Sequence, residues 1–464
     1  MSRRVFLDKR GAAAYKHRRE MVRLRRGGTA LHDQGGDGDW CARRTNIWCT
    51  VAVAKALVIT STSPPVAGRD VEGHYKRLRL LMGAVGAVAD RVEVLHLVPR
   101  RVVDAHPDPA ELNRTQTAYW GLPVSATLVA WREREETLLN HHVKGIFTAS
   151  RQEKFFGPSG ERQAAAVAQA LDRGPDLVFV HRLPAMCAFL RTGRRERAVA
   201  FDIDDVEHRM KLRAALHPPL RPGKLFSLAQ VPAVFAAERA AVARSRLTFV
   251  CSETDREGLR RLGLSRGVTV VPNAVEVPDA PPPLPAEPTL LFMGDYGYDP
   301  NREAAERGAA RILPAVRRRV PDARLLIAGK RTERLDRAAL AGPGVECLGF
   351  VEDLGRLYAR ARVVCCPISN GGGTRVKLIE GAAYGRPLVS THVGAEGLGF
   401  ADGREILLAD GDDDLAAGCA RVLADDGLCH ALGAAARDKA RAEYDAERIQ
   451  DRVAGLLRGM MAGA

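Results

Sequence analysis

The 464-residue chain lacks any uninterrupted apolar run of about 18 residues, the length that a membrane-spanning helix needs. Its first 26 residues are basic and broken, without the apolar centre of a secretory signal. The nine cysteines are scattered and none forms a C-x-x-C pair, which excludes a zinc ribbon and a small disulfide scaffold. These absences favour a cytoplasmic protein with free thiols.

Several catalytic signatures are also missing. The chain has no G-x-x-x-x-G-K-S/T loop, no H-E-x-x-H pair and no G-x-S-x-G turn, so a P-loop ATPase, a zincin and an α/β-hydrolase are excluded. Aromatic residues make up only 5% of the chain, which disfavours base stacking on single-stranded nucleic acid. No metal site is predicted.

The net charge of +14 is unevenly distributed. Residues 1–50 hold 12 lysines and arginines against 5 acidic residues, which is half of the excess. The body is therefore only mildly basic, and no specific binding of nucleic acid is expected. We expect residues 1–50 to form a basic, disordered extension. Nonspecific binding of acidic lipid or nucleic acid through it remains open.

Two series of short apolar strands alternate with helical patterns. The first lies at 56–62, 92–98, 176–180, 198–203, 247–252 and 268–271, and the second at 289–293, 323–328, 345–350, 363–367, 387–391 and 406–408. Such alternation is typical of parallel sheets covered by helices on both faces. The chain is therefore predicted to be an α/β protein with two doubly wound, Rossmann-like domains.

A proline-dense segment divides the two series. Residues 277–288 contain six prolines, which cannot join the interior of a sheet and stiffen a linker. We therefore expect an extension over 1–50, a first domain over 51–276, a linker over 277–288 and a second domain over 289–443. A last helix over 444–464 is expected to cross back to the first domain.

The most informative segment runs from Asn370 to Glu380, with the sequence NGGGTRVKLIE. Three glycines let backbone N–H groups approach a ligand, and the positive end of the following helix points at them, which suits a phosphate. Arg375 and Lys377 add positive charge. Glu380 shares a helix face with Lys377, and a carboxylate there fits a ligand that also carries hydroxyls, such as a ribose or a hexose.

This segment resembles the donor-sugar site of retaining GT-B glycosyltransferases of glycosyltransferase family 4. The matching pattern is G-G-G-T-R-x-K-x-x-E-x-x-x-x-G-x-P-x-V-S-T. Many members carry two glutamates; here the second is Glu380, and Gly372 stands at the first position. The resemblance is specific from about 289 to 457. It implies two domains facing each other across a cleft, retention of anomeric configuration and no metal requirement.

The resemblance also implies roles for individual residues. Arg375, Lys377 and Glu380 are the expected catalytic residues: the cations would stabilise the departing diphosphate, and Glu380 would bond ribose or sugar hydroxyls. The other residues expected to bind the donor are Gly371, Gly372, Gly373, Thr374, Gly294, Asn301, Lys330, Phe350 and Val351.

Two strand ends in the first domain are expected to hold the acceptor. Gly68 and Gly73 flank a loop after the first strand, and Asp205 and Glu207 lie in the acidic run FDIDDVEH. Residues 209–239 then mix lysine and arginine with leucine and phenylalanine. This stretch is either an ordinary surface helix or a contact with a lipid-linked acceptor or the membrane face.

The sequence therefore predicts a glycosyltransferase that moves a sugar from a nucleotide-sugar, such as a UDP- or GDP-sugar, to a hydroxyl acceptor. The acceptor is a glycan, a lipid-linked molecule or a small molecule. No cofactor is expected beyond this co-substrate, and the enzyme is expected in the cytoplasm, with peripheral contact at the inner membrane face as a further expectation. Three alternatives stay open: an inactive GT-B scaffold that binds a sugar nucleotide or a partner, nucleic-acid binding through the basic extension, and a nucleotide-sugar epimerase.

Overall fold

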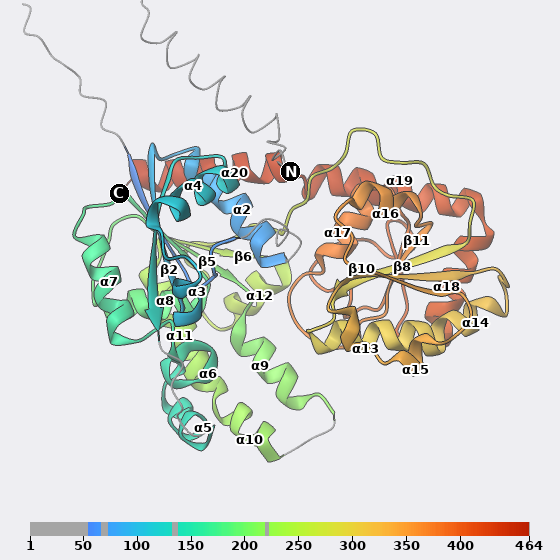
Figure 1. Ribbon diagram of the computed structural model, residues 1–464, viewed down its shortest axis with the longest axis horizontal. Helices are drawn as coiled ribbons and strands as arrows, with labels where there is room; N and C mark the ends of the chain where they lie inside the picture. Colours follow the sequence, from blue (N-terminus) through green and yellow to red (C-terminus); the bar gives the residue numbers. More distant parts are fainter. Residues whose placement is uncertain (1–53, 66–72, 132–137, 219–221, 464) are drawn as a thin grey trace, which may run out of the picture.

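The computed structural model describes residues 54–65, 73–131, 138–218 and 222–463. The expected extension over 1–50 and the candidate Gly68 lie outside these residues. The described residues form two α/β units, each a parallel sheet flanked by helices, which lie next to each other along the long axis of the molecule (Figure 1).

The first sheet has seven parallel strands in the order β3-β2-β1-β4-β5-β6-β7. Their bounds are β1 (Lys55–Thr60), β2 (Arg91–Pro99), β3 (Val124–Trp131), β4 (Leu177–His181), β5 (Val199–Asp204), β6 (Leu247–Val250) and β7 (Val268–Val270). Alternate residues of β1 enter two different apolar clusters, one on each face of the sheet. The strand order reverses beside β1, and ligands of open α/β sheets bind at such a point.

The second sheet has six parallel strands in the order β10-β9-β8-β11-β12-β13. Their bounds are β8 (Thr289–Asp295), β9 (Arg324–Lys330), β10 (Val345–Gly349), β11 (Val363–Cys366), β12 (Leu388–Ser390) and β13 (Leu407–Leu408). The predicted fold class, two doubly wound domains, is confirmed. Strand β3 was not predicted, because it is an edge strand whose outer face is exposed at Ser125 and Thr127, so it shows no continuous apolar run.

Helices connect the strands in both units. In the first they are α2 (Gly73–Gly86), α3 (Arg100–Asp104), α4 (Pro109–Trp120), α5 (Leu138–Phe147), α6 (Glu153–Phe156), α7 (Glu161–Leu171), α8 (Leu183–Arg191), α9 (Glu207–Leu216), α10 (Pro222–Ala229), α11 (Val231–Arg244) and α12 (Glu253–Arg261). In the second they are α13 (Asp299–Arg307), α14 (Leu313–Arg317), α15 (Arg337–Leu340), α16 (Leu354–Ala359), α17 (Val376–Ala383), α18 (Asp412–Ala424) and α19 (Asp426–Glu443), and α20 (Ala446–Ala462) follows.

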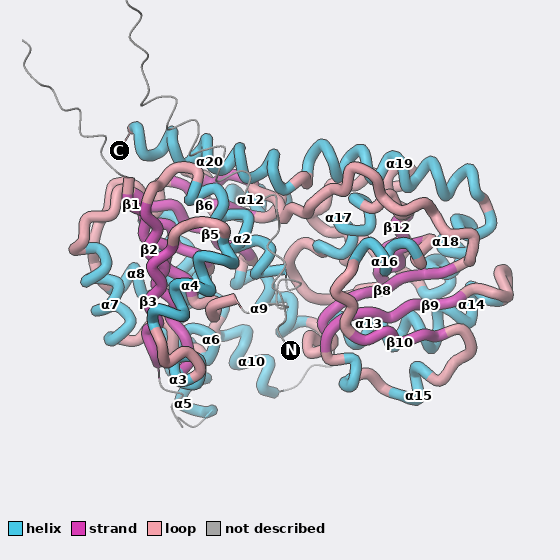
Figure 2. The backbone as a smooth tube through the Cα atoms, turned by 45° about the horizontal axis from the view of Figure 1, so that its top comes forward, coloured by secondary structure: helices cyan, strands magenta, loops and turns pink. Residues whose placement is uncertain are grey.

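Helix α20 returns to the first unit. Its residues Ile449, Val453 and Leu457 belong to the apolar cluster that also holds Val58 of β1 and Leu78 of α2. Figure 2 shows α19 and α20 running in succession along one side of both units.

The proline-rich linker lies on the second unit and is held by arginines. Arg437 donates to the carbonyl of Pro278 at 2.6 Å, Arg386 to that of Pro282 at 2.6 Å, and Arg362 to that of Pro285 at 2.7 Å. Prolines offer carbonyl acceptors but no N–H donors, and guanidinium groups satisfy such acceptors well. The linker therefore has a defined path over the second unit.

Candidate active site

Two helix amino ends meet between the domains. Helix α2 begins at Gly73, and α17 begins at Val376 directly after the glycine loop. A Cβ placed on Gly73 would lie 3.6 Å from Cγ2 of Val376, so the two helix ends are in contact range. A helix amino end carries partial positive charge and N–H groups that have no partner within the helix, so the convergence of two such ends suits an anionic ligand.

The three glycines of the loop are each approached closely by another side chain. Cβ atoms placed on Gly371, Gly372 and Gly373 would lie 2.5 Å from the Tyr298 hydroxyl, 2.5 Å from Met210 Cγ and 2.6 Å from Asp205 Oδ1. Gly371 and Gly373 also adopt φ angles of +96° and +76°, which residues with a Cβ rarely take.

These contacts give a structural reason for a glycine at position 372. Met210 of α9 occupies the space that a side chain at this position would need. Met210 belongs to the first domain, so the local sequence of the loop does not disclose the contact.

Lys377 lies among residues that the sequence predicts to bind the donor. Its Nζ donates to Oδ1 of Asn301 at 2.8 Å and lies 4.2 Å from the centre of the Phe292 ring. A Cβ on Gly294 would lie 3.1 Å from the same Nζ. Burial lowers the pKa of Lys377 to about 8, since removal from water disfavours the charged ammonium. The structure thus brings Lys377, Asn301 and Gly294 together.

Arg375 supports the loop. Its guanidinium donates to the backbone carbonyls of Gly372 and Gly373, and to that of Asn370 at 3.3 Å. The side chain is buried. The resemblance implies that Arg375 faces the diphosphate, whereas in the structure its guanidinium bonds carbonyls of the loop itself.

Glu380 forms an ion pair with Lys76 of the first domain. The carboxylate is buried, whereas the Lys76 side chain keeps 23% of its exposure. Lys76 lies one turn into α2, so the pair joins α2 to α17 across the domain boundary. Lys76 was not predicted from the sequence; its position in the first turn of a helix, three residues after Gly73, was the available signal.

The two acidic candidates of the first domain occupy different positions. Asp205 lies against Gly373, and burial together with the nearby charge of Asp204 raises its pKa to about 7. Glu207 instead pairs with Lys154 of its own domain. Asp205 therefore reaches the glycine loop of the second domain, whereas Glu207 is held by a lysine of the first domain.

The remaining donor candidates lie at the carboxyl ends of β9 and β10. Phe350 is 41% exposed, and the Lys330 ammonium lies 5.5 Å from the centre of its ring. Val351 is half-buried and packs against the core of the second domain. An exposed aromatic ring beside a cation provides a surface on which a nucleotide base can stack.

A buried polar chain behind the site was not predicted. His181 Nδ1 lies 3.0 Å from Asp202 Oδ2, and the Arg77 guanidinium forms two bonds near 3 Å with the Asp202 carboxylate. Arg77 also donates to Asn273 Oδ1 at 3.3 Å, and Asn273 Nδ2 donates to Thr374 Oγ1 at 2.7 Å. The chain thus runs from the first sheet to the glycine loop.

Burial and the charged partners act in opposite directions on the pKa of Asp202. Burial alone would raise the pKa of Asp202, but Arg77 and His181 hold it at about 2. None of the described residues offers a hydrogen-bond partner to the buried His181 Nε2. The acids of FDIDD are evident in the sequence. The partners of Asp202, His181 of β4 and Arg77 of α2, are remote from it in sequence and could not be predicted.

Arg213 ties the two domains together at the side of the loop. It donates to the carbonyl of Gly371 at 2.9 Å and pairs with Glu396 at 2.5 Å. The space enclosed between Asp205, Arg213, the loop and Glu396 is only about 30 Å³. That is room for about one water molecule, so the domains are nearly in contact here.

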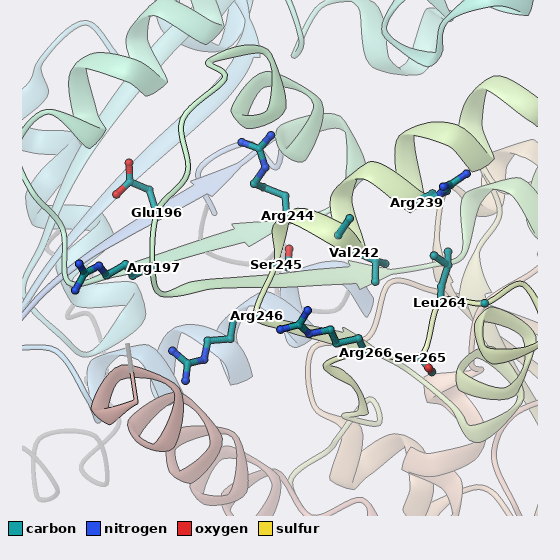
Figure 3. A pocket seen from close by; sticks show the side chains of 12 residues that line it. Glu196, Arg197, Arg239, Val242, Arg244, Ser245, Arg246, Leu264, Ser265 and Arg266 are labelled. Carbon is teal, nitrogen blue, oxygen red and sulfur yellow. The ribbon is translucent and has the colours of Figure 1, made fainter.

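A larger pocket of about 630 Å³ lies elsewhere, at the amino ends of β5, β6 and β7 (Figure 3). We call it the arginine pocket. Its five arginines are Arg197, Arg239, Arg244, Arg246 and Arg266, with Glu196 as the acid among the lining residues. None of the sequence-predicted site residues lines it. Among the described residues, no group of three or more histidines, cysteines or acids is placed to hold a metal ion.

Comparisons with known proteins agree with this architecture. Residues 287–425 match the family described as Glycosyl transferases group 1. No curated protein matches the chain. Sucrose-phosphate synthase from Thermosynechococcus elongatus is similar in structure, with a TM-score of 0.63 and 18% identity, covering 89% of this chain and 100% of that one.

Two further solved structures are similar. HepE of Anabaena, solved in complex with UDP, gives a TM-score of 0.57 at 15% identity over 87% of this chain and 100% of its own. WaaG, a glycosyltransferase involved in lipopolysaccharide biosynthesis, gives 0.54 at 14% identity over 87% of this chain and 100% of its own. The chain therefore has the two-domain GT-B fold, and its second domain matches the family described as Glycosyl transferases group 1 over residues 287–425.

Proposed function

We propose that this protein transfers a glycosyl group from a nucleotide-sugar to a hydroxyl acceptor, with retention of anomeric configuration and without a metal ion. The observation that carries the proposal is the convergence of two helix amino ends, those of α2 and α17, on the glycine loop, with Lys377 beside them. This is an anion site at the carboxyl edge of two parallel sheets, where a diphosphate fits.

The donor would lie mainly on the second domain. Its diphosphate would meet the amides of Gly371–Gly373 and the ammonium of Lys377, and the base would stack near Phe350. Glu380 would bond sugar or ribose hydroxyls once its pair with Lys76 opens. The HepE structures with UDP and with UDP-glucose support a nucleotide-sugar as the donor class.

The chemical step breaks the bond from the anomeric carbon to the diphosphate oxygen and forms one to the acceptor oxygen. The acceptor proton passes to the leaving phosphate on the same face of the sugar. Negative charge builds up on the diphosphate, and preorganised amides and Lys377 stabilise it. Since these groups supply positive charge, we propose that no metal ion is needed. Asp205, which reaches the loop from the first domain, would orient the acceptor hydroxyl.

The closed arrangement at the loop has a consequence for turnover. The space of about 30 Å³ beside Asp205 is too small for a sugar, so we propose that the domains open to admit the acceptor and then close on it. Closure excludes water and so limits hydrolysis of the donor.

We propose a cytoplasmic enzyme that works in peripheral contact with the inner membrane face.

The test is a panel of UDP- and GDP-sugars with hydroxyl acceptors, scored by release of free nucleoside diphosphate and by NMR of the product. Acceptor-dependent release with the donor's anomeric configuration supports the proposal. Donor binding without any release would identify an inactive scaffold. Conversion of the donor to another nucleotide-sugar without an acceptor would identify an epimerase.

A further inference from the structure

The arginine pocket lies at the edge of the first sheet that is opposite to the glycine loop. Strand β5 joins the two places: Arg197 lies two residues before this strand, and Asp205, which contacts the loop, directly follows it. A strand of six residues is about 20 Å long, so the strand separates the pocket from the proposed donor site. A ligand in the pocket and a donor at the loop can therefore be bound at the same time.

The pocket is lined by guanidinium groups rather than ammonium groups. Among the described residues that line it, five are arginines, none is a lysine, and Glu196 is the acid. A guanidinium group presents a planar fork of N–H donors that matches two oxygens of a phosphate. Figure 3 shows Arg244 on one side of Ser245, and Arg246 and Arg266 on the other. This lining suits an oxyanion.

Most of these arginines have no acidic partner within the protein. Four are exposed and have no carboxylate partner among the described residues: Arg197, Arg239, Arg246 and Arg266. Arg244 instead donates to the backbone carbonyls of Gly193 and Arg194. Exposed side chains change rotamer within nanoseconds, so the four exposed arginines can turn onto a ligand.

The ends of nearby helices do not balance this charge. Helix α11 ends at Arg244, α12 ends beside Gly263, and a Cβ on Gly463 at the end of α20 would lie 2.7 Å from a guanidinium nitrogen of Arg246. Three helix carboxyl ends supply about 1.5 negative charges. Five arginines against one glutamate give +4, so an excess of about 2.5 positive charges is left. Because like charges around one hollow repel each other, a bound anion would stabilise the pocket.

The backbone that carries the pocket is anchored in the core. The segment Gly223–Arg244 is long and apolar enough to cross a membrane by length and composition, but α11, its second half, is part of the domain. Val234 of α11 is a core residue, and the buried Glu238 accepts a bond from the backbone N–H of His208 at 3.2 Å. Arg239 directly follows Glu238, so it projects from a helix whose position is fixed. A preformed site of this kind costs little ordering of the backbone when a ligand binds.

We propose that the arginine pocket binds a compact soluble polyphosphate, an anion with two or three linked phosphate groups. The volume of about 630 Å³ exceeds what one phosphate needs and lies within the range of small-molecule sites. Ser265 adds a hydroxyl donor. Among the described residues that line the pocket, none is aromatic, so no ring is placed to stack on a nucleotide base. The phosphate groups are the recognised part, and the proposal does not depend on sugar transfer.

Isothermal titration calorimetry of the full chain with sodium tripolyphosphate tests this site. At a salt concentration of about 0.15 M, attraction between exposed charges is screened beyond about 8 Å. We expect a variant carrying Arg246→Gln and Arg266→Gln to bind at least about tenfold more weakly at one site, since each arginine supplies charge-assisted hydrogen bonds to phosphate. Arg197→Gln with Arg239→Gln should give the same loss and replaces the first variant if that variant does not fold. Both variants keep the basic extension of the parent, so the difference reports the pocket.

Two controls separate the pocket from general charge and from the glycine loop. Arg319→Gln with Arg337→Gln removes two exposed arginines of the second domain and should leave tripolyphosphate binding at the pocket unchanged. Lys377→Met weakens the proposed donor site and should also keep the pocket site. An equal loss in the first control, a loss in Lys377→Met alone, or no binding by the parent would overturn the proposal.

Two further probes test the class of ligand. Orthophosphate should bind at least about tenfold more weakly than tripolyphosphate, because one phosphate group contacts fewer arginines. Vesicles that contain phosphatidylglycerol should bind the parent and the pocket variants equally. Vesicle binding that requires the pocket arginines, without binding of tripolyphosphate, would make the pocket a membrane contact and overturn the proposal. The pocket variants should transfer sugar like the parent; absence of transfer in all of them with intact tripolyphosphate binding by the parent would count against the proposed function only.

Discussion

Asn273 Nδ2 donates a 2.7 Å hydrogen bond to Thr374 Oγ1, and this bond joins the first domain to the glycine loop of the second. Asn273 is itself held by Arg77, which bonds the buried Asp202. The loop that would receive the donor is thus fixed to the core of the opposite domain. If the loop binds the donor as proposed, donor affinity and the relative position of the domains depend on each other.

That bond can be tested by a double-mutant cycle. Asn273→Ala and Thr374→Val should each weaken UDP binding by about fivefold to tenfold, the value of one hydrogen bond of about 1 kcal/mol. Because both remove the same bond, the double variant should bind no more weakly than the weaker single variant. Isothermal titration calorimetry gives the three affinities. Fully additive losses would show that the two side chains act separately.

Arg77→Met should destabilise the first domain by about 3–5 kcal/mol, because it leaves the Asp202 charge buried and unpaired. Arg77 and Asp202 side chains are both fully buried. Urea unfolding followed by circular dichroism measures the effect. Arg79→Met on the same helix is the matched control, since Arg79 is exposed, and it should cost less than about 1 kcal/mol. Equal losses would contradict the role of the pair.

Lys377→Ala should lower transfer by about 10²-fold with little loss of fold, the scale of removing one preorganised charge stabiliser. The lowered pKa of Lys377, about 8, adds a pH signature. Below pH 8 the ammonium is charged and attracts the diphosphate, and above it the proton is lost. UDP affinity of the parent should therefore fall as the pH rises through 8, and that of Lys377→Met should not. A parallel fall in both proteins would assign the titration to another group.

Asp205→Asn should lower transfer to the acceptor and leave donor affinity nearly intact. The raised pKa of Asp205, about 7, means that the folded state holds a proton that the unfolded state releases near pH 4. Its contribution to stability is present below pH 4 and is lost as the pH rises through 7. At pH 8 the asparagine variant should therefore be more stable than the parent, by at least about 1 kcal/mol. Thermal unfolding at pH 5 and pH 8 tests the sign, since the gain should shrink at pH 5.

Glu380→Gln should weaken binding of an intact nucleotide-sugar by about 10–100-fold, the cost of losing a charged hydrogen-bond partner. Pyrophosphate affinity should change much less. Lys76→Met is the informative control, because it removes the ion pair but leaves the carboxylate free for the sugar. If both variants lose affinity equally, or if Glu380→Gln binds like the parent, then Glu380 only holds the domains together.

The sequence by itself determined the class of fold and the anion loop. Strands such as Leu290–Phe292 and Val363–Cys366 are apolar throughout, and buried parallel strands must be so because helices cover both faces. The glycines at 371–373 mark a close approach of other side chains to the loop, and Gly371 and Gly373 also adopt φ angles that favour glycine. These features are local, so pattern and spacing disclose them.

Only the tertiary structure decided what each polar side chain does. Arg375 and Lys377 are two residues apart, yet one holds loop carbonyls and the other meets Asn301. Glu380 meets Lys76, 304 residues away, and Arg77 meets Asp202, 125 residues away. The strength of a charge depends on its burial and its partners. Both are set by how α2 packs over the first sheet and against α17, which no local pattern records.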